Sequence, residues 1–223
     1  MFSPPWKQAP CQPELLYFHG VPAAVQNWSV IRAGRLTSRR RTPGTYIPGV
    51  KAFQVTVAKE SLGFSAAHFL TLPGHMCERL HGHNYRVAVT VDGELDPGTG
   101  FVIDFAVLKR AVRALIEPLD HRVLIPERNP RLTLREEPDR LVVDYETRKS
   151  WLVVPREHAC LVPVVNTTAE QLAEWLGAAL QAELLTAGAA GVRRLSLELE
   201  ESTGQSATVM VPPHNQEWRM EAE

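Results

Sequence analysis

Residues 81–91, which read HGHNYRVAVTV, contain the pattern that decides the fold. From His83 to Val91, tyrosine and valine side chains take every second position, and polar or small side chains stand between them. A period of two is typical of a β-strand that has one buried and one exposed face. Such a strand needs neighbours along its edges and a layer that covers its apolar face.

Similar alternation marks the neighbouring strands of the predicted sheet. Residues 53–57 form one extended stretch and residues 64–70 a second, and a loop over residues 71–80 then leads into the strand above. Near the C-terminus, residues 192–201 alternate again, and residues 207–211 are their expected partner. These segments supply the strands of an antiparallel sheet.

Two amphipathic helices are predicted between the strands. Asp104 is a good N-cap, and apolar residues follow it at three- and four-residue spacing as far as Leu119. A second helix is expected to begin near Thr167, because Thr167 and Glu170 have the spacing of a capping box. Gly188 would end it.

The order of elements predicts an α+β domain over residues 51–223, with a four-stranded antiparallel sheet and both helices on one face. Residues 131–165 interrupt this order. Within them, residues 140–145 and 151–154 are short strand-like runs around a polar turn, so we expect an inserted β-hairpin.

Residues 1–50 differ in composition from the rest of the chain. They are rich in proline, glycine and arginine, and Glu14 is their only acidic residue. We expect a disordered extension. A transit peptide is the alternative, but the scattered proline and tryptophan residues do not form a clear amphipathic helix, and there is no secretory signal pattern.

The composition of the 223 residues gives no sign of a nucleic-acid or membrane partner. The formal net charge is −1, so nothing points to nucleic acid or to an anionic membrane, and no apolar run approaches membrane-spanning length. The three cysteines are far apart and odd in number. A disulfide framework is therefore not expected, and we predict a reduced, cytoplasmic protein.

His81 and His83 are the sharpest candidate site. Residues i and i+2 of a strand point to the same side, so both imidazoles can grip one metal ion, with His68 as a third ligand. Three imidazoles with an open fourth position form a catalytic zinc pattern. Taken alone, the spacing slightly favours two surface or cleft histidines without a metal.

Three further groups of residues could take part in catalysis or binding, but each of them also has a purely structural interpretation when it is considered alone. Cys77 is an inert apolar residue, a reactive thiolate or a fourth zinc ligand. Asp120 and His121 form a proton-transfer pair or a purely local contact at a helix end. Strand parity places Glu201 on the apolar face, where its carboxylate needs a partner such as the amino and amide groups of a pterin ring.

Together these residues resemble the 6-pyruvoyl-tetrahydropterin synthase superfamily, and most closely its bacterial 6-carboxy-5,6,7,8-tetrahydropterin synthase branch, which acts in queuosine biosynthesis. The three-residue gap between Cys77 and His81 also resembles that branch. The matching blocks, in chain order, are Phe64–His68, Gly74–Tyr85, Ile103–Phe105, Leu119–His121, Asn166–Glu170, and Glu201 followed by Ser206-Ala207.

The resemblance implies roles for these residues. His68, His81 and His83 would bind zinc, and Cys77 would be the general acid and base, assisted by Asp120 and His121. Glu201 would anchor the pterin. The substrate would be 7,8-dihydroneopterin triphosphate, and the products would be 6-carboxy-5,6,7,8-tetrahydropterin, acetaldehyde and triphosphate.

The resemblance also implies a tunnelling fold, in which three subunits join their sheets into a barrel and two barrels stack. We therefore expect a homohexamer, a dimer of trimers, with active sites at subunit interfaces. The insertion and residues 1–50 have no counterpart in the family. Rival outcomes are 6-pyruvoyl-tetrahydropterin formation or aldol cleavage on the same scaffold, and a non-catalytic, zinc-stabilised binding protein.

Overall fold

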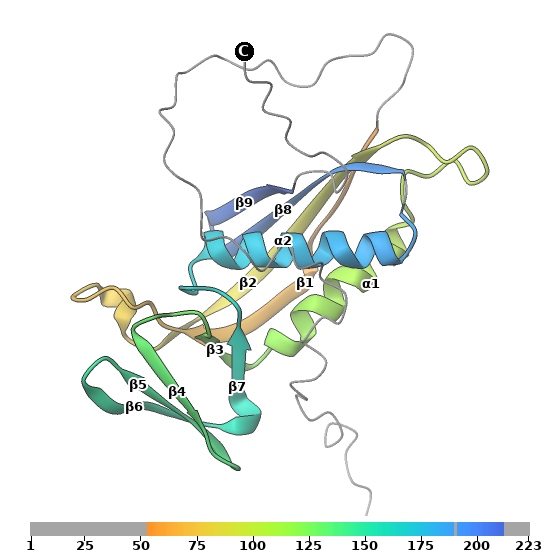
Figure 1. The fold of residues 1–223 in the computed structure, drawn as a ribbon. Helices are drawn as coiled ribbons and strands as arrows, with labels where there is room; N and C mark the ends of the chain where they lie inside the picture. The colour runs from red at the N-terminus through yellow and green to blue at the C-terminus, as the bar shows by residue number, and fades with distance from the viewer. Residues whose placement is uncertain (1–52, 190, 212–223) are drawn as a thin grey trace, which may run out of the picture. The chain divides into compact units, whose positions relative to one another are not determined.

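A computed structural model describes residues 53–189 and 191–211 of the chain (Figure 1). The extension predicted for residues 1–50 lies outside this part. Within the described residues no helix has the length and apolar character that crossing a membrane requires.

The main sheet has six strands, in the order β7-β3-β1-β2-β8-β9. Four of them are antiparallel neighbours: β1 (Phe53–His68), β2 (His81–Gly93), β8 (Val192–Ser202) and β9 (Gln205–Val211). Beyond β1, the short strands β3 (Arg122–Pro126) and β7 (Ala159–Val162) add in parallel. The prediction of a four-stranded sheet was therefore wrong by these two strands, although the antiparallel set is present.

The first strand is continuous where the sequence indicated two separate stretches. Its pairing with β2 changes register between Ala58 and Gly63, which accommodates the break in the alternation. A Cβ at Gly63 would lie 2.9 Å from the Tyr85 carbonyl oxygen, so glycine permits the close approach of the two strands there.

Both helices lie on one face of the main sheet (Figure 1). Helix α1 (Phe105–Ile116) begins at the predicted cap, since the Asp104 carboxylate accepts a hydrogen bond from the Ala106 amide at 2.7 Å. Helix α2 (Ala169–Thr186) is capped by Thr168, not by Thr167. The Thr167 hydroxyl instead donates to the Phe69 carbonyl at 2.8 Å, so the predicted capping box was wrong.

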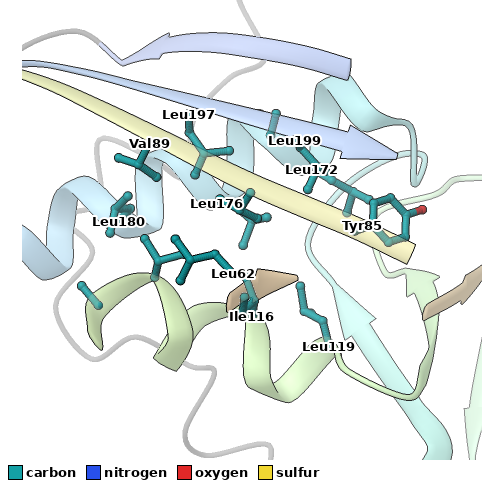
Figure 2. Packing of buried hydrophobic residues seen from close by; sticks show 14 of the residues in the cluster. Leu62, Tyr85, Val89, Ile116, Leu119, Leu172, Leu176, Leu180, Leu197 and Leu199 are labelled. Carbon is teal, nitrogen blue, oxygen red and sulfur yellow. The ribbon is translucent and has the colours of Figure 1, made fainter. Parts of the chain in front are cut away.

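The helices and the sheet enclose one main hydrophobic cluster (Figure 2). Leucines of α2, such as Leu172 and Leu176, pack against the alternating apolar residues of β2 and β8. Each fully buried side chain of this kind stabilises the fold by about 1.5–3 kcal/mol. The alternation of β2 and β8 is thus explained by this single covered face.

Most of the insertion forms a three-stranded sheet and not the predicted hairpin, and its last strand, β7, belongs to the main sheet. The hairpin strands β5 (Arg140–Tyr145) and β6 (Arg148–Pro155) are present, but β4 (Leu132–Glu136) pairs with the other edge of β5. A second hydrophobic cluster joins this sheet to the main one. It includes Phe69, which directly follows β1 and has no exposed surface. Short 3-10 helices complete the fold at Met76–Glu78, Glu117–Leu119 and Arg156–His158.

Candidate metal centre

The candidate site lies where the apolar face of the main sheet ends. His68 and His81 are direct partners across β1 and β2, and His83 faces Ala66 one step further along. The same face of β8 passes from Leu199 to Glu201. The covered face of three neighbouring strands therefore ends in polar side chains, which lie together because the strand register aligns them.

His68, His81 and His83 are the residues of the described chain that form a possible metal-binding group. One ring nitrogen from each lies within 4.8 Å of the other two. The ring centroids are 4.5 to 5.1 Å apart. Gly82 lies between His81 and His83 on β2, and a Cβ there would approach the Ala66 carbonyl oxygen to 3.3 Å. The sequence prediction of three converging imidazoles agrees with this geometry.

Backbone carbonyls hold two of the rings. Nδ1 of His68 lies 2.9 Å from the Thr167 carbonyl oxygen, and Nδ1 of His81 lies 2.7 Å from the Arg79 carbonyl oxygen. Each Nδ1–H therefore donates to a carbonyl, which leaves the lone pair on Nε2. The two Nε2 atoms are only 3.1 Å apart.

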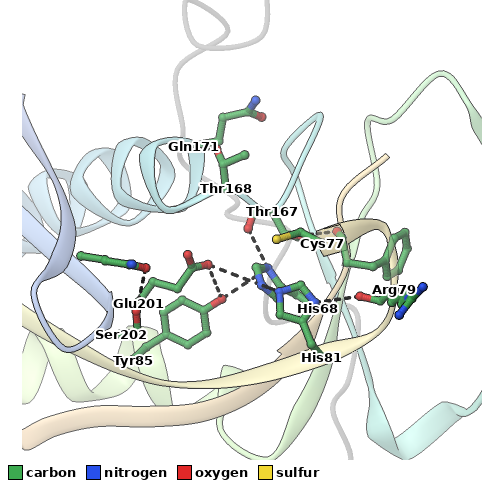
Figure 3. Close-up of polar contacts among 12 residues, drawn as sticks. His68, Cys77, Arg79, His81, Tyr85, Thr167, Thr168, Gln171, Glu201 and Ser202 are labelled. Carbon is green, nitrogen blue, oxygen red and sulfur yellow. Dashed lines mark hydrogen bonds and ion pairs between the residues drawn. The ribbon is translucent and has the colours of Figure 1, made fainter. Parts of the chain in front are cut away.

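This arrangement fits a cation. Two Nε2 lone pairs face each other, and Oε1 of Glu201 lies 3.4 Å from Nε2 of His68 (Figure 3). The two imidazole lone pairs repel each other because no hydrogen lies between them, and a metal ion would satisfy both. Burial lowers the pKa of His68 to about 4; the Thr167 hydrogen bond opposes this effect, and the neighbouring histidines add to it. His68 is thus neutral near pH 7, as a metal ligand must be.

Tyr85 and Glu201 extend the site along the sheet. The buried Tyr85 hydroxyl donates to Oε1 of Glu201 at 3.2 Å. The pKa of the phenol is raised, mainly by its burial and also by the negative charge of Glu201. Glu201 retains 23% exposure of its side chain, so part of its carboxylate faces the open side of the cluster. Sequence reasoning placed Glu201 on this face but missed Tyr85, whose parity two residues after His83 was a usable signal.

Cys77 lies in the loop between β1 and β2, within the 3-10 helix Met76–Glu78. Its side chain is half-buried, and the cysteine is free. It is not a member of the three-histidine group. Figure 3 shows it near the cluster, next to Thr167. The amide of Leu70 donates to the Cys77 carbonyl at 2.8 Å, which ties the loop to the end of β1.

Asp120 and His121 contact each other at the end of the segment after α1. Nδ1 of His121 lies 2.9 Å from Oδ2 of Asp120, and the His121 side chain is 82% exposed. Oδ1 of Asp120 accepts a hydrogen bond from the Ser65 amide at 2.8 Å. The structure records no hydrogen bond from this pair to Cys77 within the described ranges 53–189 and 191–211.

A family model described as 6-pyruvoyl tetrahydropterin synthase matches residues 56–212. This range contains every candidate residue of the site. Among curated proteins, a Methanocaldococcus jannaschii protein with the provisional name 6-carboxy-5,6,7,8-tetrahydropterin synthase is 31% identical over 147 residues, which are 66% of this chain and 88% of the relative. Human 6-pyruvoyl tetrahydrobiopterin synthase is 56% identical over 45 residues, or 20% of this chain and 31% of the relative.

The structural comparison gives a similar result. The crystal structure of 6-pyruvoyl tetrahydropterin synthase from Plasmodium vivax superposes with a TM-score of 0.66 at 27% sequence identity. The match covers 73% of this chain and 99% of that one. The sheet and helices that position the histidines are thus shared with a solved structure of the same family description.

Proposed function

Because the chain belongs to the 6-pyruvoyl tetrahydropterin synthase family, we propose that it is a zinc-dependent lyase acting on 7,8-dihydroneopterin triphosphate. The products would be 6-carboxy-5,6,7,8-tetrahydropterin, acetaldehyde and triphosphate. The observation that carries the proposal is the convergence of three imidazoles, two of which, His68 and His81, have Nε2 lone pairs that face each other with no hydrogen between them. The relatives that bear the carboxy name, at 31–36% identity, support this choice of product.

Zinc would be held by His68, His81 and His83. Three neutral imidazoles suit zinc, and the fourth position would remain available to the substrate because Cys77 is outside the group. The metal would polarise a substrate oxygen and so make the adjacent carbon more acidic. The carbonyls of Thr167 and Arg79 would fix the ring orientations.

Cys77 would move the proton. A thiolate at Sγ next to a bound cation would take a proton from a side-chain carbon of the substrate and return it later. Asp120 would keep the His121 ring in one orientation through the 2.9 Å contact at Nδ1, leaving Nε2 free to exchange a proton.

Glu201 would bind the pterin ring. Its carboxylate already accepts from Tyr85, and the remaining lone pairs face the site. Two N–H donors on the pterin would satisfy them, as the family resemblance implies. The buried Tyr85 would fix the direction of this carboxylate through the hydrogen bond that its hydroxyl donates to Oε1 of Glu201.

We also propose assembly into a hexamer with sites at subunit interfaces. The supporting observation is that Cys77 and His121 make no contact with each other among the described residues, although both are assigned to one proton-transfer step. Among the described residues, β7 and β9 are the outer strands of the sheet, and their outer edges would offer places for neighbouring subunits to pair.

A second outcome is 6-pyruvoyl tetrahydropterin formation. The human relative with that activity in its name shares 56% identity over 45 residues, which favours keeping this candidate. The two outcomes differ in whether the carbon side chain remains attached to the pterin. The site residues proposed above would serve either reaction.

Product analysis tests the proposal. The zinc-loaded protein is incubated with dihydroneopterin triphosphate, and the pterins are identified by mass spectrometry. We expect the 6-carboxy compound and acetaldehyde, with no turnover after zinc removal by a chelator. Cys77→Ala should lower kcat about 10²–10⁴-fold with zinc retained, whereas Cys160→Ala, a buried cysteine outside the site, should not. Accumulation of the pyruvoyl or hydroxymethyl compound would reject the carboxy assignment.

A further inference from the structure

The inserted sheet contacts the loop that carries Cys77. The turn between β5 and β6 reaches this loop, and Nη2 of Arg148 donates to Oε1 of Glu78 at 2.6 Å. Glu78 is the residue directly after Cys77. The Glu78 side chain is 19% exposed and that of Arg148 is 46% exposed, so only the carboxylate side of this short, charge-assisted hydrogen bond is largely shielded from water.

The guanidinium of Arg148 is fixed from its other side. Its Cζ lies 3.9 Å from the centre of the Tyr145 ring and 5.7 Å from that of Trp151. Cation–π contacts at such distances are favourable and limit the rotamers of the arginine. The Arg148 hydrogen bond is also the main reason that the pKa of Glu78 lies below its ordinary value.

A second tether reaches the start of the loop. Nη1 of Arg131 donates to the Thr71 carbonyl at 2.8 Å, and its Nε donates to Glu146 at 2.7 Å. Between the tethers, the rings of Phe69 and Trp151 pack edge to face with centroids 4.7 Å apart. The insertion thus touches the loop at its beginning and beside Cys77.

Apart from these side chains and the Leu70 amide, which donates to the Cys77 carbonyl at 2.8 Å, the loop has few contacts outside itself. None of residues 72–80 is buried, and the apolar side chains of Leu72, Met76 and Leu80 are exposed. Its own contacts are short-range, such as the Gly74 amide donating to Glu78 at 3.3 Å. A segment without buried apolar contacts depends on polar tethers for its position.

We propose that Arg148 is a positioning residue, through which the inserted sheet holds the loop and keeps Cys77 beside the three histidines. This inference rests on the proposed function for the role of Cys77. It concerns the insertion, which contains none of the residues proposed to bind zinc, bind the pterin or transfer a proton. Without the Arg148–Glu78 contact the loop would sample open positions, and proton transfer by Cys77 would slow while zinc and substrate still bind.

Hydrogen exchange of the zinc-loaded full chain tests the tether directly. Arg148→Met keeps an apolar stem over Tyr145 but removes the charge. We expect deuterium uptake in peptides covering residues 69–80 to become about tenfold faster, since local opening is no longer opposed by the ion pair. Arg148→Lys retains a cation without the planar fork and should restore part of the protection.

The matched control is Arg140→Met. Arg140 lies at the opposite end of β5 and pairs with Glu137 and Asp139 inside the insertion. Its variant should leave exchange of residues 69–80 unchanged. Equal exchange in Arg148→Met and in the natural protein would overturn the proposal, and so would an equal increase in the Arg140 control, because the effect would then be general destabilisation.

Kinetics separate positioning from binding. Arg148→Met should lower kcat about tenfold, with KM changed less than about twofold and with the zinc content unchanged. A rise in KM alone would contradict a role in placing Cys77. If the natural protein forms none of the expected pterins, the proposed function fails, whereas the exchange comparison still decides whether Arg148 holds the loop.

Discussion

The histidine cluster and the Cys77 loop lie side by side, but they are held in place in different ways. The imidazoles extend from paired strands, and the register of β1 against β2 sets His68 opposite His81. Cys77 lies in a loop whose residues 72–80 are not buried, and one of its tethers, Arg148, comes from the insertion. A metal site can therefore follow from strand pairing alone, whereas the placement of a loop residue depends on contacts that each chain supplies for itself.

Removal of a strand-borne ligand should have the largest effect. In His81→Ala, zinc affinity should fall by more than about a hundredfold, because loss of even an outer-sphere partner commonly costs 10–100-fold. Metal analysis after dialysis measures this. His158→Ala, an exposed histidine at the end of the insertion, is the control and should keep its zinc. Full zinc content in His81→Ala would contradict the site.

Glu201, on β8, offers a second test of whether residues held by paired strands form the site. Glu201→Gln should raise KM for the pterin substrate about tenfold or more, since a charged acceptor for the ring is lost. Steady-state kinetics measure this effect. Glu198→Gln is matched, because Glu198 belongs to the same strand but is exposed on the opposite face. Equal KM values in the two variants would exclude Glu201 from pterin binding.

The smallest effect concerns the insertion itself. The Ser150 amide at 2.7 Å is the main cause that lowers the pKa of Asp144 to about 2, and Arg135 and Lys149 add to it. Because this folded-state pKa lies below the ordinary value of 3.8, the carboxylate stabilises the fold above that pH, and the contribution is lost as the pH falls toward 2.

Asp144→Asn should therefore lower the melting temperature at pH 7, and the difference from the natural chain should shrink below about pH 4. Thermal unfolding followed by circular dichroism at several pH values measures this. Asp139→Asn, on a largely exposed residue, is the control. A difference that grows on acidification would show that the sign of the Asp144 contribution is wrong.

The sequence was informative wherever one local pattern determined the outcome. Asp104 caps its helix, and the parity of β8 brings Glu201 onto the covered face, because both depend on neighbours along the chain. The short strands β3 and β7 were missed, since their parallel pairing joins residues distant in sequence. Thr167 was misassigned as a cap because its hydroxyl binds the distant Phe69 carbonyl.

The same limit applies to the candidate site. The three histidines could be grouped from their spacing and the family resemblance. The backbone carbonyls that accept hydrogen bonds from two of the rings could not be predicted in this way. The carbonyl of Thr167 reaches His68 across 99 positions of the chain, and only the folded structure brings them together. The contact between Arg148 and Glu78 is equally remote, and no alternation or capping pattern indicates it.

One consequence follows from the neighbours His68 and Phe69. Adjacent residues at a strand end face opposite ways, so one ring joins the histidine cluster while the next is buried against the insertion. An engineer who trimmed residues 132–158 to obtain a minimal enzyme would leave Phe69 and Ile125 facing water. The shortened chain would need polar replacements at both positions, and the first of these, at Phe69, would be next to His68 of the histidine cluster.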